Sequence, residues 1–185
     1  MEQLHSSAWL TLGLSIAVTP MQVGARSIAF ARLTLLGFYM WLAGAVLIAV
    51  AILNGGGIGG ADGDMVDLSL AAMILMMLGV VAAAISVATT VLTSRAPGIT
   101  MRRVPFFSWT ALVQAISLIV TAPVMVGLTI LLFVDHRNSA LVFGNSDALA
   151  DWLPRFFSAP MVYIYAIPVL GVFAELLPVS VSRRH

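Results

Sequence analysis

Reactive side chains are few in this sequence, and the stretch most like a catalytic motif, FFSAPMVYI at 156–164, holds only one of them. Tyr163 carries a phenol, whereas Ala159 has no donor atom and Met161 offers only a thioether sulfur. Without a histidine, cysteine or acid, the stretch neither binds a metal nor moves a proton easily. Three interpretations are open: an active site, the remains of one, or the start of a membrane helix.

Glu175 is the second candidate, because it is the single acid inside the apolar run that extends from 158 to 181. Acids within membrane segments are taken as functional groups by default. Helix geometry also brings Arg183 or Arg184 within reach of Glu175. Two roles are therefore open for this side chain: an ion pair at the end of the span, and a functional carboxyl inside the membrane.

The usual metal-binding side chains are equally sparse. The sequence has no cysteine, which excludes disulfides, thiolate metal sites and covalently attached c-type haem. Its three histidines lie outside the interiors of the long apolar runs, and we expect them to be solvated rather than metal-bound: His5, His136 and His185.

Composition places these candidates in a membrane. Of the 185 residues, 61% are hydrophobic and only 9% are charged, and the mean hydropathy is +1.04. Soluble domains are about half apolar and about a quarter charged, so the lipid bilayer is the first expected partner. The formal net charge of +1 gives no basic surface for nucleic acid.

The apolar runs predict the elements that position the candidates. A membrane-spanning helix needs about 20 mainly apolar residues, and a shorter apolar segment at 8–18 falls below that length. We expect an all-α membrane protein in which residues 1–185 form one bundle, with a short N-terminal helix and no signal peptide. Four runs are long enough to span: 28–53, 68–93, 104–134 and 158–181.

Charge is distributed unevenly between the connections. Positive charge marks the cytoplasmic side of a membrane protein, and four spans would place Arg26, the 95–103 loop and the C-terminus there together. The acidic connections at 54–67 and 135–155 would then face the opposite side. A face of small residues in the second span is typical of close helix packing, and comprises Gly79, Ala82, Ala83 and Ser86.

Four longer motifs, taken in order, resemble subunit I of the haem–copper terminal oxidases. They are TPMQVGARSIAFARLTLLGFYMWLAG, ATTVLTSRAPGITMRRVPFFSWTALV, TAPVMVGLTILLFVDHRN and RFFSAPMVYIYAIPVLGVFAELLPVSVSRR. The last is similar to the family form that begins WFFGHPEVYI, and the second has a bacterial form. The resemblance extends from about Leu12 onward and implies the second to sixth helices of a subunit I, less than half of that subunit.

The resemblance implies a bacterial inner membrane and a place in aerobic respiratory electron transport. The family oxidises cytochrome c or quinol, reduces dioxygen and pumps protons, using haem and copper. Other terminal oxidase subunits would then be partners.

The same resemblance assigns roles to particular positions. The family's copper-ligand histidine corresponds to Ala159, its proton-carrying glutamate to Met161, and its active-site tyrosine to Tyr163. Its proton-entry aspartate corresponds to Ser27, and a proton-channel asparagine to Ile16. Only the tyrosine retains the family's side chain.

The replaced side chains predict that this chain is not catalytic alone and carries no cofactor by itself. An alanine offers no metal ligand, and a thioether has no proton to exchange. Two readings follow: a subunit I relative in terminal oxidase electron transport, or a non-catalytic, haem-free paralogue that packs against oxidase subunits in assembly or regulation. A third, an unrelated small transporter or scaffold, is disfavoured by the order of the motifs.

Overall fold

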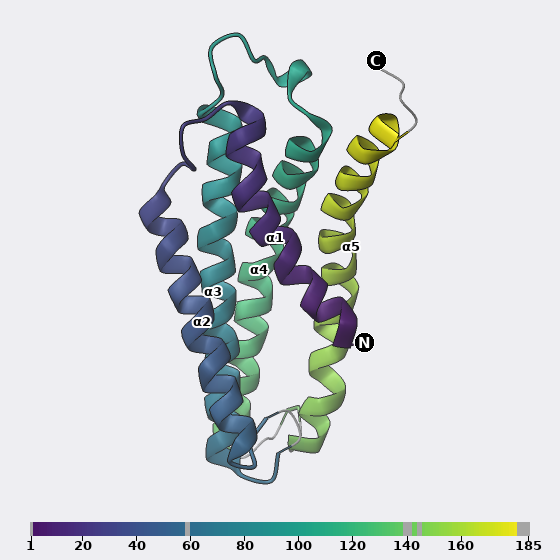
Figure 1. The fold of residues 1–185 in the computed structure, drawn as a ribbon. Coiled ribbons are helices and arrows are strands. Elements are labelled where there is room, and N and C mark those ends of the chain that lie inside the picture. Colours follow the sequence, from purple (N-terminus) through teal and green to yellow (C-terminus); the bar gives the residue numbers. More distant parts are fainter. Residues whose placement is uncertain (1, 58–59, 139–141, 144–145, 181–185) are drawn as a thin grey trace. The chain divides into compact units, whose positions relative to one another are not determined.

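The computed structural model describes residues 2–57, 60–138, 142–143 and 146–180, with side chains described outside 2–10, 146–150, 156, 159 and 178–180. The described elements are all helical (Figure 1). Five α-helices and a short 3₁₀-helix, η1 (Met101–Arg103), follow one another along the chain. The α-helices are α1 (Glu2–Val23), α2 (Ala31–Leu53), α3 (Gly63–Thr93), α4 (Phe106–Arg137) and α5 (Ser146–Ser180).

Four of the helices are long and apolar enough to cross a membrane, which confirms the predicted fold class. The spans are Ala31–Leu53, Gly63–Thr93, Phe106–Arg137 and, within α5, Pro160–Leu177. The shorter apolar helix is Thr11–Val23 in α1. The chain is therefore a multi-pass membrane protein with the lipid bilayer as its surroundings.

Helix α1 is longer than the predicted 8–18 segment because helix formation does not require apolar residues. At its C-terminal end, Gly24 takes a left-handed φ of 70°. The Ala25 N–H donates to the Pro20 carbonyl at 2.9 Å, and the Gly24 N–H donates to Met21 at 3.3 Å. This is the Schellman arrangement, which satisfies the last carbonyls of a helix and ends it.

Helix α5 begins at Ser146, twelve residues before the start predicted from the apolar run. Its first part carries the exposed side chains Asp151 and Arg155, so hydropathy alone does not reveal it. Pro160 consequently lies inside a continuous helix, and the membrane-spanning part of that helix begins at Pro160, within FFSAPMVYI.

The chain divides into two compact units, and α2, α3, α4 and α5 contribute to both. Unit 1 contains residues 1–34, 83–119 and 161–185, and unit 2 contains 35–82 and 120–160. The single bundle expected from the sequence stays a prediction.

Unit 1 packs α1 against the parts of α3, α4 and α5 that belong to it. Val23, Val87 and Val91 are fully buried, as are Ala111 and Ala115 of α4. The Ala96 N–H donates to the Val23 carbonyl at 3.0 Å, so the connection after α3 is attached to the end of α1.

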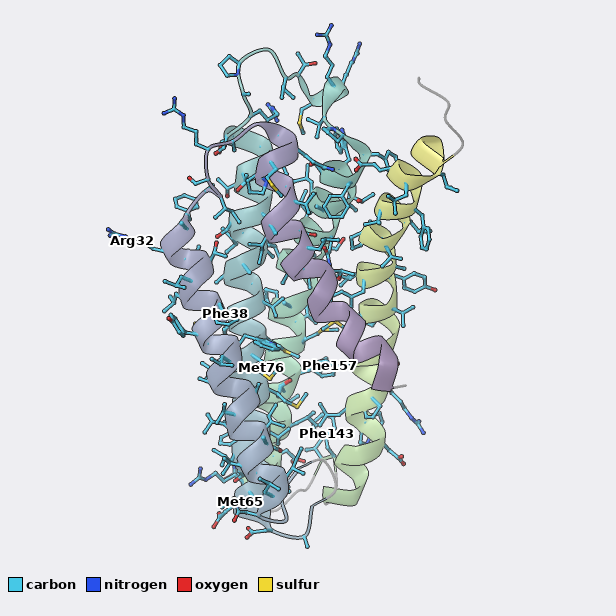
Figure 2. All side chains as sticks on the ribbon, viewed as in Figure 1. Arg32, Phe38, Met65, Met76, Phe143 and Phe157 are labelled. Atoms are coloured by element: carbon cyan, nitrogen blue, oxygen red, sulfur yellow. The ribbon has the colours of Figure 1, made fainter. Side chains whose placement is uncertain are left out.

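Unit 2 holds the closest approach of α2 to α3. A Cβ atom added at Gly79 would lie 2.5 Å from the Gly37 carbonyl oxygen and 2.9 Å from the Trp41 backbone nitrogen. Only glycine allows the two backbones to come this near. A second glycine, Gly44, faces Ala72 and the Met76 side chain labelled in Figure 2. The packing role predicted for Gly79 is confirmed.

Candidate functional site

The three positions matched to the family's copper-ligand histidine, proton-carrying glutamate and active-site tyrosine lie on α5. Tyr163 is 73% exposed, and its hydroxyl makes no hydrogen bond to a described residue. Met161 is half-buried. The side chain of Ala159 lies outside the described residues, although its helical backbone is part of α5.

The two positions matched to the proton path lie in unit 1. Ile16 is half-buried in α1, and Ser27 is exposed in the segment between α1 and α2. No hydrogen bond among the described residues joins either of them to Tyr163.

Haem and copper, the cofactors that the resemblance implies, need side chains with donor atoms as ligands. In the part of the chain that the structure describes, no group of three or more His, Cys, Asp or Glu side chains could hold a metal ion. Position 159 is alanine in the sequence, and a methyl group has no lone pair to donate. The described residues therefore do not fit a haem–copper centre by themselves.

A polar group in unit 1 is centred on Glu175. Its Oε2 accepts a hydrogen bond from Gln22 Nε2 at 2.8 Å, and its Oε1 accepts one from the Phe107 backbone N–H at 2.9 Å. The Gln22 Oε1 accepts a third from Ser108 Oγ at 2.7 Å. We call Gln22, Phe107, Ser108 and Glu175 the Glu175 cluster.

The Glu175 cluster joins three helices at the beginning of α4. Phe107 lies in the first turn of α4, where backbone N–H groups have no partner within the helix. A carboxylate there satisfies a free donor and complements the positive end of the helix dipole. Glu175 is thus a helix cap supplied by α5 and steadied by Gln22 of α1. Its two predicted ion-pair partners, Arg183 and Arg184, lie outside the described residues.

A second polar group, deeper in unit 1, joins α1 to α4. Gln114 is fully buried and accepts a hydrogen bond from Ser15 Oγ at 3.3 Å. Its Nε2 donates to Thr11 Oγ1 at 3.4 Å. Both distances are long for such bonds, so these contacts are weaker than those of the Glu175 cluster. Thr19 is buried on the same face of α1, and its hydroxyl has no partner among the described residues.

Sequence reasoning missed the amides and hydroxyls of both groups. Thr11, Ser15, Thr19 and Gln22 recur at spacings of four, four and three, which places them on one face of a helix. That periodicity could have identified them. Gln114 gives no comparable signal, because a single neutral amide in an apolar run indicates neither its partner nor its burial.

A short contact between two side chains in unit 2 corrects the expectation for His136. Its Nδ1 lies 2.7 Å from Asp67 Oδ1, and the two side chains are only 13% and 15% exposed. His136 is thus shielded and paired rather than solvated. The adjacent Asp135 accepts backbone hydrogen bonds from Val142 at 3.0 Å and Phe143 at 2.9 Å. The end of α4 is held to the start of α3 and to its own following loop.

Comparison with known proteins agrees with the motifs. The family model described as cytochrome c and quinol oxidase polypeptide I matches residues 5–185. A probable cytochrome c oxidase subunit 1-beta from Nocardia farcinica is 30% identical over 192 residues, which cover 95% of this chain and 32% of that protein. Cytochrome c oxidase subunit 1 of Bacillus subtilis is also 30% identical, over 95% of this chain and 30% of its own length.

A putative subunit 1-beta from Streptomyces coelicolor is 31% identical over 95% of this chain and 33% of its own. The chain spans about a third of the length of these curated relatives. With nearly every residue matched by the family model, the chain belongs to the cytochrome c and quinol oxidase polypeptide I family.

Proposed function

We propose that these residues are a non-redox scaffold of a bacterial terminal oxidase, packing against oxidase subunits in assembly or regulation. The observation that carries the proposal is alanine at position 159, where the family resemblance places the copper-ligand histidine. Imidazole is the commonest metal ligand in proteins, and no partner can supply a donor atom in place of this methyl group. Haem and copper are therefore not bound by these residues alone.

The use of the intramembrane polar groups supports the scaffold role. Glu175 accepts hydrogen bonds from Gln22 and from the first turn of α4, and Gln114 connects α4 to α1. These bonds fix helices against one another. The alternative is a working oxidase subunit that oxidises cytochrome c or quinol. Tyr163 favours it, because that position retains the family's phenol.

Purification from membranes, followed by a haem spectrum and copper analysis, tests the proposal. We expect no haem or copper stoichiometric with the chain, together with co-purification of oxidase subunits. A haem Soret band stoichiometric with the isolated chain would overturn the haem-free role.

The variant Ala159→His sharpens this test. Copper binding should not appear in it, nor in the control Ala166→His, which places the same imidazole at an exposed position of the same helix. Copper bound by the first variant and not by the second would show that the remaining ligands exist, and would favour the catalytic alternative.

The orientation is a further part of the proposal: the arginine-rich segments around Arg26 and 95–103 face the cytoplasm of a bacterial inner membrane. The chain contains no cysteine, so one introduced thiol is a unique label. An impermeant maleimide should label Ala61→Cys from outside intact cells and Ser27→Cys only after permeabilisation. The reverse pattern would refute this orientation.

A further inference from the structure

Five arginines of unit 1 form what we call the basic plate: Arg26, Arg32, Arg95, Arg102 and Arg103. Each lies at or just beyond a helix boundary. Four of these side chains are exposed, and Arg95 is half-buried. Arg32 points away from α2 in Figure 2. Among the described residues, none of the five guanidinium groups has a carboxylate partner. The short contact between a basic and an acidic side chain in that part of the chain joins His136 to Asp67.

Two hydrogen bonds donated by backbone N–H groups hold the segments of the basic plate in place. The Ala96 N–H donates to the Val23 carbonyl at 3.0 Å, which fixes the 95–103 connection to the end of α1. The Ala29 N–H donates to Thr90 Oγ1 at 2.9 Å, which fixes the segment between Arg26 and Arg32 to α3. The charged segments are thus positioned before any ligand binds.

Gly24 lets the two segments meet closely. Its φ of 70° favours glycine, and a Cβ atom there would lie 2.9 Å from the Ala96 Cβ. Any side chain at this position would push the 95–103 connection away from α1.

Internal contacts also order the connection that carries three of the arginines. Arg95 Nη1 donates to the Val91 carbonyl at 2.9 Å and lies 2.7 Å from Met101 Sδ. Trp109 Nε1 donates to the Met101 carbonyl at 3.0 Å. Arg95 thus serves mainly to shape the connection, which leaves the exposed Arg102 and Arg103 of η1 as its free charges.

We propose that the basic plate binds the phosphate groups of anionic phospholipids. Guanidinium groups match phosphate oxygens in geometry and charge, and unpaired ones retain their full attraction. Their position at the ends of apolar helices places them at headgroup depth, where anionic lipids attract basic side chains. The partly exposed Trp109 and the exposed Phe106 beside them are typical of the same interfacial layer. These observations favour a lipid over a soluble acidic protein.

Native mass spectrometry of the whole chain in a neutral detergent tests this inference. The probes are phosphatidylglycerol and phosphatidylcholine with identical acyl chains, so the preference between them reports the headgroup. The wild type should retain phosphatidylglycerol preferentially. Replacing Arg102 and Arg103 together by glutamine should weaken that binding about 30-fold, since each interfacial arginine contributes about 5-fold.

The matched control replaces Arg137 and Arg155 by glutamine. These two exposed arginines belong to unit 2, where the described acids outnumber them, so the same loss of charge should change phosphatidylglycerol binding little. Equal losses in both double variants, or equal retention of the two lipids by the wild type, would overturn the proposal.

Two arms with the wild type remain informative even if a variant fails to fold. Raising the chloride concentration should weaken the preference for phosphatidylglycerol, because screening reduces exposed charge interactions. Inorganic phosphate should compete no better than chloride at the same ionic strength. Stronger competition by phosphate would indicate a site for free anions instead of a lipid surface, and selective retention of acidic proteins with no lipid preference would indicate a protein partner.

Discussion

Replacing Gly79 by alanine tests the closest contact between α2 and α3. The new Cβ atom would lie 2.5 Å from the Gly37 carbonyl oxygen and 2.9 Å from the Trp41 nitrogen, both of them backbone atoms. Ordinary carbon–oxygen contacts are near 3.3–3.6 Å, so the helices would have to separate by about 1 Å. A gap of that size forfeits a quarter to a half of the dispersion energy across the contact.

The magnitude follows from two opposing effects. Overpacking in a well-packed contact costs about 1–3 kcal/mol, whereas exchanging glycine for alanine in a helix gains up to about 1 kcal/mol. Gly79→Ala should therefore lower the free energy of unfolding by about 1–2 kcal/mol. Gly127→Ala is the matched control, because this α4 glycine has no atom within 4 Å of its added Cβ. It should leave stability unchanged or raise it.

Reversible unfolding in mixed detergent micelles, followed by circular dichroism, measures both variants under the same conditions. The expected order of stability is Gly127→Ala, wild type, Gly79→Ala. If Gly79→Ala proved as stable as Gly127→Ala, the close approach of the two backbones would not limit packing, and the reasoning would fail.

The polar contacts give three further predictions, each measured by the same unfolding assay. Glu175→Leu should lower the free energy of unfolding by about 1–3 kcal/mol, because the Phe107 N–H and the Gln22 amide lose a charged acceptor. No change in this free energy would exclude a role of Glu175 as the cap of α4. Gln114→Leu should cost less than about 1 kcal/mol, since its hydrogen bonds are long and membrane hydrogen bonds average about 0.6 kcal/mol. Asp67→Asn should destabilise the protein by about 1 kcal/mol and, in NMR spectra, shift the His136 ring resonances. Unshifted resonances would argue against that contact.

The extent to which the helices were predictable depended on where apolar residues begin and end. The second predicted span ended at Thr93, as α3 does, because apolar residues continue to that point. The fourth predicted span, 158–181, contains the membrane-spanning part of α5, Pro160–Leu177. Helix α5 itself begins earlier, at Ser146, since its first residues are polar enough to escape a hydropathy criterion and still favour a helix. Span prediction therefore reported membrane depth, which differs from helix length.

The candidate site was predictable only where a residue type stood out. Glu175 did so as the one acid in its apolar run, but its partners are a backbone N–H and the neutral amide of Gln22. Such partners are set by the rotation and depth of packed helices, which one sequence does not specify. The pairing of His136 was missed for the same reason, because Asp67 lies on another helix.

The Glu175 cluster also has a consequence for the order in which the protein is made. Synthesis begins at the N-terminus, so the donor groups of Gln22 and Phe107 enter the membrane before the helix that carries their acceptor exists. Unsatisfied polar groups are costly in lipid. Arrival of α5 therefore completes unit 1, and nascent chains that stop before Glu175 leave the Gln22 amide and the Phe107 N–H without their carboxylate acceptor.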